Sequence, residues 1–280
     1  MAKGAAFKSG LGRCIFCKRQ PPDVVMSKEH VFPDWLRQIF PRSEGTTHTL
    51  GVMEWAGSPG RSPARETRKQ RPGHSGTKKI RRVCKTCNET WLSNKIEKIA
   101  KPILAPLISG EKIELDAARQ RILATWAAKT VMTAEQMHPN KVVIHQAERT
   151  WLKENLAPPA GWNVWVGTYN GFAWGELAVQ QHAGLLRFPA VDDGNPAEHN
   201  LVFTILGMRH LMLVVTSSTW PRMWEIMESV GSPSALCLSR IWPVVQASVS
   251  WPRPIVLTDA DADQMADAYR ARIWAQPVKR

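Results

Sequence analysis

The sequence predicts an α+β protein with a cysteine-rich unit over residues 1–110. A mixed α+β domain with antiparallel hairpins is predicted over residues 111–280. Three observations lead to this prediction: two Cys-x-x-Cys pairs in the first part of the chain, a concentration of positive charge in the same part, and alternating helical and strand-like apolar patterns in the remainder. With 280 residues, 44% of them apolar, the chain can bury a sizeable core.

Four of the five cysteines form two pairs, Cys14/Cys17 in "CIFC" and Cys84/Cys87 in "CKTC". Two such pairs provide the four thiolates of a tetrahedral structural zinc site. The N-terminus lacks the apolar stretch of a signal peptide, and no run is long enough to span a bilayer, so we expect a cytoplasmic protein without membrane contact, in which disulfides are rare. The alternatives for the pairs are a redox motif or chance spacing. Cys237 is interpreted as a buried apolar residue.

Positive charge is distributed unevenly along the chain. Residues 1–100 hold 20 Lys and Arg against 8 Asp and Glu, which gives +12, and the remaining residues contribute 17 against 16, or +1, to the total of +13. A basic block of this kind is typical of a protein that binds nucleic acid, because neutralised phosphates release counterions. A solvated basic face or a disordered basic tail would have the same composition.

The part between the cysteine pairs divides into two pieces. Residues 28–40, "KEHVFPDWLRQIF", predict a short strand, a turn at Pro33 and then helical spacing of Trp35, Leu36 and Ile39. Residues 56–79 are rich in Gly, Ser, Pro and basic residues and predict a long flexible loop. In and beyond this loop, the basic residues expected to contact nucleic acid are Arg68, Lys69, Arg71, Lys78, Lys79, Arg81 and Arg82.

Helical spacing predicts a helix that begins at or just after Asn88 and is broken by Pro102 and Pro106, and a second helix over 115–137. Trp35 and Trp91 are expected to pack around the cysteine pairs.

The second half has strand-like segments followed by short helices. A hairpin turning at Asn170-Gly171 and a strand pair around Gly207 are expected, then helices over 221–230 and 259–275. Thr258 and Asp261 have the spacing of a capping box at the start of the last helix. The tryptophans of this half are interpreted as core residues rather than base-stacking residues, and they are Trp162, Trp165, Trp174, Trp220, Trp224, Trp242 and Trp251.

Glu29 and His30 lie between the two cysteine pairs, and Asn88 directly follows the last cysteine. One zinc ion clamping both pairs would draw the strand of Glu29 and His30 towards the helix that opens at Asn88. A carboxylate and an amide oxygen are ligands for Mg²⁺ or Mn²⁺, and a histidine can accept a proton from water near neutral pH. The set suits metal-assisted hydrolysis of a phosphodiester.

At these residues the chain resembles the HNH endonucleases, the zinc-knuckle branch of the ββα-metal nucleases, over residues 12–105. The matching motifs are "EHVFP" after the first Cys-x-x-Cys and "CKTCN" at the second. The resemblance implies that Glu29 and Asn88 hold a catalytic Mg²⁺ or Mn²⁺, that His30 is the general base, and that DNA is the substrate. It also implies a structural Zn²⁺ held by Cys14, Cys17, Cys84 and Cys87. A bacterial or phage origin and a homodimer are compatible with it.

The chain departs from the family pattern at one place. The middle asparagine expected shortly before the second cysteine pair is missing, and the segment reads "GTKKIRRVC". A backbone carbonyl or His74 would then have to orient His30, or the protein would be a weak or inactive nuclease. Asn88 alone could also be an N-cap, and His30 alone a structural histidine.

Two hypotheses from different classes follow. The first is a metal-dependent DNA endonuclease, with residues 111–280 in an accessory role. The second is a non-catalytic zinc-ribbon protein that binds nucleic acid, such as a regulator or a phage accessory protein. Both require zinc and phosphate affinity, and strand cleavage that depends on His30 distinguishes them.

Overall fold

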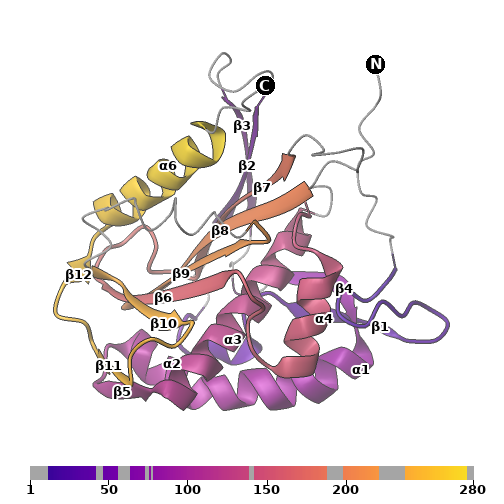
Figure 1. The fold of residues 1–280 in the computed structure, drawn as a ribbon, viewed down its shortest axis with the longest axis horizontal. Coiled ribbons are helices and arrows are strands. Elements are labelled where there is room, and N and C mark those ends of the chain that lie inside the picture. Colours follow the sequence, from indigo (N-terminus) through magenta and orange to yellow (C-terminus); the bar gives the residue numbers. More distant parts are fainter. Residues whose placement is uncertain are drawn as a thin grey trace.

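A computed structural model describes residues 12–41, 47–55, 64–72, 76, 78–138, 142–187, 198–220 and 237–275 (Figure 1). In these ranges the chain is a mixed α+β protein with antiparallel sheets, as predicted. No helix among the described residues is long and apolar enough to cross a bilayer. His74, Trp224 and the helix expected over 221–230 lie outside the described residues.

The N-terminal part has the order strand, strand, helix. Strand β1 (Met26–His30) pairs antiparallel with β4 (Lys79–Cys84), with Glu29 opposite Ile80 and His30 opposite Lys79. Between them along the chain lies a short 3₁₀ helix, η1 (Asp34–Gln38), at the place where the spacing of Trp35, Leu36 and Ile39 predicts helix. Beyond β4 the chain turns directly into α1 (Lys85–Cys87), the π-helical segment η3 (Asn88–Glu97) and α2 (Lys98–Ser109).

The start and the end of this long helix differ from the prediction. The helix begins at Lys85, because Cys84 is the N-cap and its sulfur accepts a hydrogen bond from the backbone N–H of Cys87. Asn88 is therefore not the N-cap. Pro102 and Pro106 lie inside α2 rather than ending it, on the side opposite the buried face of Ile103, Leu104, Leu107 and Ile108. Burial of that face outweighs the lost backbone hydrogen bonds.

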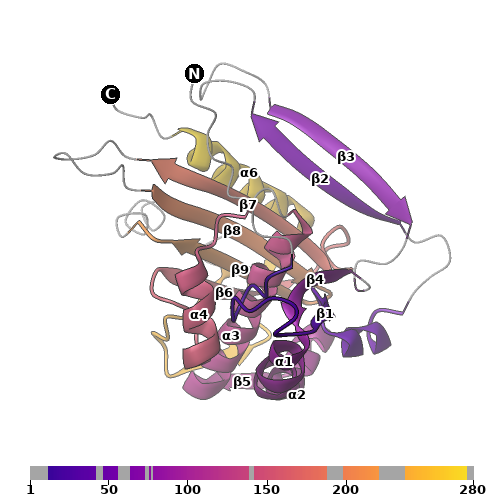
Figure 2. The ribbon, with the colours of Figure 1, turned by 90° about the vertical axis from the view of Figure 1, so that its right-hand side faces the viewer.

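The loop predicted over 56–79 is a strand in part. Strand β3 (Ala64–Pro72) pairs antiparallel with β2 (Thr47–Trp55) in a two-stranded ribbon that stands apart from the larger sheet (Figure 2). The basic composition of 64–72 gives no strand signal by itself. Its partner, "THTLGVMEW", is rich in residues that favour strands, and the pairing of the two segments is a contact that local composition does not show.

The larger sheet has the order β10-β6-β9-β8-β7, with β12 parallel to β6. The bounds are β6 (Trp162–Tyr169), β7 (Ala178–Arg187), β8 (Glu198–Met208), β9 (Leu211–Ser218), β10 (Ser239–Trp242) and β12 (Val256–Leu257). A separate pair joins β5 (Ile113–Asp116) to β11 (Ser248–Trp251).

The hairpin predicted at Asn170-Gly171 is wrong. Strand β6 pairs with β9, β10 and β12, whereas β7 pairs with β8. The Asp259 carboxylate accepts hydrogen bonds from the Tyr169 hydroxyl and from the N–H groups of Phe172 and Ala173, so the turn is bound to the start of the last helix. Strands β9 and β10 occupy the two edges of β6, so β7 pairs elsewhere.

The strand pair predicted around Gly207 is present as β8 and β9, but its turn falls at Arg209-His210, where Arg209 has a φ of 48°. Gly207 remains within β8. A Cβ there would lie 2.1 Å from the backbone oxygen of Trp174, so the close approach of these two segments requires glycine.

Helices cover both faces of the larger sheet. Helix α3 (Ala117–Ala134), continued by the 3₁₀ turn η4 (Glu135–Met137), lies between the sheet and α2, and α4 (Gln146–Asn155) packs beside it (Figure 1). Helix α6 (Asp259–Ala275) covers the opposite face with Ala262, Met265 and Ala266. Its start has the predicted capping box, because Thr258 N–H donates to Asp261 and Asp261 N–H donates to the Thr258 hydroxyl.

The hydrophobic core continues across residue 110. One cluster of buried side chains extends from Cys14 and Phe16 through the face of α2 and α3 to Trp251. Trp162, Trp174 and Trp251 are core residues as predicted, whereas Trp165, Trp220, Trp242 and Cys237 are half-buried. Side chains of α3 therefore lie against the N-terminal strands.

Candidate metal centre and catalytic site

The first cysteine pair lies in a tight turn. Lys18 N–H donates to the carbonyl of Cys14, and Cys14 N–H donates to the carbonyl of Arg19. Lys18 has a φ of 62°, in the left-handed region that non-glycine residues seldom adopt, and this conformation closes the turn so that both sulfurs point to one side. Ile15 N–H donates to the carbonyl of Arg82, which holds the turn against β4.

The second cysteine pair lies at the junction of β4 and α1. Cys84 ends the strand and Cys87 lies one helical turn later, so the two side chains are presented together. Lys85 N–H donates to the carbonyl of Val25, the residue before β1, so the start of the helix is hydrogen-bonded to the start of that strand. Phe16 of the first pair and Trp91 of the helix are in edge contact, with ring centroids 4.9 Å apart, as the packing role of Trp91 predicts.

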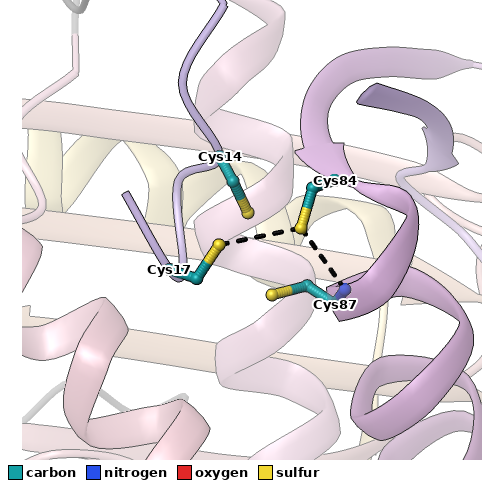
Figure 3. A group of neighbouring side chains, drawn as sticks. All are labelled: Cys14, Cys17, Cys84 and Cys87. Carbon is teal, nitrogen blue, oxygen red and sulfur yellow. Dashed lines mark hydrogen bonds between the residues drawn. The ribbon is translucent and has the colours of Figure 1, made fainter. Parts of the chain in front are cut away.

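The four cysteines from these distant segments converge (Figure 3). All four sulfurs lie within 4.8 Å of one another, and those of Cys17 and Cys84 are 3.7 Å apart. Zinc–sulfur bonds of about 2.3 Å in a tetrahedron place sulfurs about 3.8 Å apart. The cluster could therefore hold a zinc ion. A hydrogen bond from Cys87 is the largest of the effects that lower the pKa of Cys14 to about 4, which favours the thiolate.

Glu29 is buried and forms an ion pair. Its Oε1 lies 2.8 Å from Nζ of Lys129 on α3, and the same Nζ lies 2.7 Å from Oε1 of Glu97 on η3. The side chain of Glu29 is 5% exposed. Burial raises the pKa of Glu29, against the opposing effect of the Lys129 charge. The Lys129 ammonium therefore already pairs with Oε1 of the Glu29 carboxylate.

His30 lies at the end of β1 and is partly exposed. Its Nε2 is 2.9 Å from Nη2 of Arg37 and 3.3 Å from Oδ1 of Asp34, and Asp34 and Arg37 form an ion pair of 2.6 Å. Partial burial, followed by the charge of Lys79, lowers the pKa of His30 below 6.5. The ring is therefore neutral near pH 7, and its Nε2 lone pair accepts the hydrogen bond from Arg37.

Asn88 is joined to β1. Its Nδ2 donates to the Ser27 hydroxyl at 3.1 Å, and that hydroxyl donates to the carbonyl of Val83 on β4. Ser27 and Glu29 lie on the same face of β1 because side chains alternate along a strand. The hydrogen bond through nitrogen leaves the Oδ1 of Asn88 for another partner.

The donor set is compatible with a hard divalent cation. Asn88 is bound through nitrogen and Glu29 through Oε1, so an amide oxygen and a carboxylate oxygen remain, on the helix and on the strand that it contacts. Oxygen donors of these two kinds are the ones that Mg²⁺ and Mn²⁺ take. Of the Cys, His, Asp and Glu side chains in the described ranges, however, only the four cysteines form a group of three or more within metal-binding reach.

The basic residues predicted to contact nucleic acid differ in exposure. On β4, Lys79 and Arg81 are exposed, whereas Arg82 is buried at 9% exposure. Arg82 lies where the pairing of β1 with β4 is irregular, and its low exposure makes it a weaker candidate for a phosphate contact than Lys79 or Arg81. Lys78 is half-buried. Arg68, Lys69 and Arg71 fall on β3, where the side chains lie outside the described part of the structure.

Sequence reasoning missed four residues around the candidate site: Asp34, Arg37, Glu97 and Lys129. A usable signal existed for Lys129, because it is the one charge in the otherwise uncharged stretch "ILATWAAKTVMTA" and buried lysines are normally paired. Asp34 follows His30 at a spacing of four residues. No signal in the sequence singles out Glu97.

A scan against protein-family models, a search of curated proteins and a search of solved structures each found no match to this chain. The class of the protein is therefore argued from its own geometry.

Proposed function

We propose that this protein is a metal-dependent endonuclease that hydrolyses phosphodiester bonds of DNA, with an N-terminal unit of the HNH type. The observation that carries the proposal is the position of His30, which stands neutral and partly exposed at the end of β1, adjacent to Glu29, on a strand that Asn88 also contacts. A zinc ion in the four-cysteine cluster would fix that strand pair against the helix.

In this proposal His30 is the general base. A guanidinium can only donate, so Nε2 accepts the hydrogen bond from Arg37 and Nδ1 carries the ring proton in this arrangement. Nε2 takes a proton from the attacking water once Arg37 turns to another acceptor, such as the phosphate. The proposal therefore requires Arg37 to release Nε2 when the substrate binds. Arg37, which is itself paired with Asp34, is then the side chain that contacts His30 where the missing asparagine, a backbone carbonyl or His74 was considered.

Glu29 and Asn88 would hold the catalytic Mg²⁺ or Mn²⁺ through the oxygens that their other contacts leave. A divalent ion at this place supplies stabilisation of negative charge on the phosphate and on the leaving oxygen. Lys79 and Arg81 lie exposed on β4, and Lys79 is the cross-strand neighbour of His30, so the positive charge that attracts the DNA backbone adjoins the base.

One observation favours a second candidate, a non-catalytic zinc protein that binds nucleic acid. Lys129 already neutralises Glu29, and a carboxylate with a resident ammonium binds a further cation less readily. On this interpretation, the same strand pair and basic residues bind DNA without cutting it.

Cleavage of a supercoiled plasmid by the zinc-loaded protein, with Mg²⁺, Mn²⁺, Ni²⁺ or Co²⁺ added in turn, tests the proposal. We expect nicked or linear product with at least one of these ions and none with a chelator. If the protein binds the plasmid but cleaves it with none of these ions, the endonuclease proposal fails and the non-catalytic nucleic-acid-binding protein replaces it.

A further inference from the structure

Lys129 is a fully buried lysine on α3, with 0% of its side chain exposed. Its ammonium joins three elements, because its two carboxylate partners come from β1 and η3. Burial alone would lower the pKa of Lys129, but the charges of Glu29 and Glu97 outweigh it and raise the pKa, so the lysine is charged. Lys129, Glu29 and Glu97 together are called the ion triad below. Apart from Lys129, the buried side chains of α3 are uncharged.

Stability alone is a weak explanation for this triad. Replacing a buried ion pair by apolar side chains of similar volume is often neutral or stabilising, because desolvation of the charges offsets their attraction. The core around α3 is built from apolar residues such as Leu123 and Val131, which shows that the surroundings suit such side chains. A charge retained there calls for a reason connected with its partners.

The partner Glu29 supplies that reason, because it precedes the proposed base His30 and lies on the face of β1 that Ser27 and Asn88 share. Lys129 Nζ lies 2.8 Å from Oε1 of Glu29 as an ion pair, without the alignment of a hydrogen bond, and no such pair engages Oε2 in the described residues. Carboxylates that bind metals in proteins are commonly held by a hydrogen bond to their other oxygen, and loss of such a partner typically lowers metal affinity or activity 10–100-fold.

We propose that Lys129 is a positioning residue that fixes the orientation of Glu29 for a divalent metal ion, so that residues 111–280 contribute a side chain to the site. The inference rests on the proposed function for the role of Glu29. It implies that residues 1–110 do not form a complete site, in contrast to the resemblance, which covers residues 12–105.

The test separates orientation from charge. The zinc-loaded protein is compared as wild type, as Glu97→Gln and as the double variant Glu97→Gln/Lys129→Met. The double variant has the same net charge as the wild type, since it loses one carboxylate and one ammonium. Relative to Glu97→Gln it has lost only the ammonium, and removal of that charge by itself would strengthen the binding of a cation.

Binding of Mn²⁺ to the protein without DNA, followed by electron paramagnetic resonance, is the main readout, and plasmid cleavage is the second. We expect the double variant to bind Mn²⁺ about 10–100-fold more weakly than Glu97→Gln, opposite to the effect of charge, and to cut correspondingly more slowly. Glu29→Gln identifies the binding that belongs to this site. Zinc content and thermal unfolding establish that each variant is folded.

Equal or tighter Mn²⁺ binding by the double variant would overturn the inference, as would a wild type that binds no Mn²⁺. If Lys129→Met does not fold, Glu97→Gln/Lys129→Leu is used, because it also removes the ammonium and leaves no donor opposite Glu29; failure of both double variants to fold would assign Lys129 to stability alone. A wild type that binds Mn²⁺ through Glu29 but cuts no DNA would refute the endonuclease and leave the positioning role intact.

Discussion

Lys129 on α3 and Glu29 on β1 form a buried ion pair of 2.8 Å, which connects the core of the second half of the chain to the strand that carries His30. The same strand is held from its other side by the pairing with β4, whose last residue, Cys84, belongs to the four-cysteine cluster. The position of His30 therefore depends on two distant parts of the chain, and each can be tested separately.

The cysteine cluster should bind one Zn²⁺ per chain. Cys14→Ser should lower the zinc content and destabilise the fold, because binding free energy at a structural zinc site contributes to folding and Cys14 belongs to the continuous core. Cys237→Ser is the matched control, since Cys237 lies outside the cluster. Metal analysis and thermal unfolding measure both effects. Purified wild type without zinc, or Cys14→Ser with full zinc content and unchanged stability, would contradict the assignment.

The exposed basic residues of β4 should contact DNA phosphates. Each phosphate contact contributes about 0.9 to the slope of log K against log salt concentration, so Lys79→Ala/Arg81→Ala should lower that slope by about 2. The double variant Lys112→Ala/Arg119→Ala removes the same charge from exposed positions beyond the N-terminal unit. Fluorescence anisotropy with a labelled duplex over a range of salt concentrations gives the slopes. Equal slopes for the two double variants would show that Lys79 and Arg81 do not form the DNA-binding surface.

The turn after β6 should make stability depend on pH. The Tyr169 hydroxyl, and then the N–H groups of Phe172 and Ala173, lower the pKa of Asp259 below 3.8 by hydrogen bonding to its ionised form. A lowered folded-state pKa stabilises the protein above the unfolded-state pKa, and this contribution is lost as the pH falls through the folded-state pKa.

Asp259→Asn should therefore lower the free energy of unfolding more at about pH 6 than at about pH 3, where part of the wild-type advantage is gone. Urea unfolding of both proteins at the two values measures the difference. A difference that does not change with pH would show that Asp259 is not held in its ionised form.

The parts of the fold that follow from local pattern could be predicted. The capping box of Thr258 and Asp261, the helix within 115–137 and the convergence of the four cysteines all depend on spacing over a few residues or on a strong ligand motif. The start of the helix was misplaced by three residues, because a cysteine served as N-cap where asparagine was the stronger signal.

The parts that depend on pairing across the chain could not be predicted. Strand β3 exists through its pairing with β2, and β7 pairs with β8 rather than β6, because β9 and β10 occupy the two edges of β6. At the site, Glu29 and His30 were found from their motif, but Lys129 reaches Glu29 through tertiary packing. Asp34 and Arg37 reach His30 locally, because η1 follows β1 after the turn at Pro33. Spacing gives the residues that one segment presents, and not the partners that distant segments supply.

The cleavage rate of His30→Ala tests the central claim most directly. General-base catalysis contributes about 10²–10⁴ in rate, so the variant should cut plasmid slower by that order while its zinc content and DNA affinity stay near wild type, because His30 belongs neither to the cysteine cluster nor to the exposed basic residues. His199→Ala, which changes a histidine of β8, should cut at the wild-type rate. Cleavage by His30→Ala as fast as by the wild type would contradict the assignment of His30 as the base.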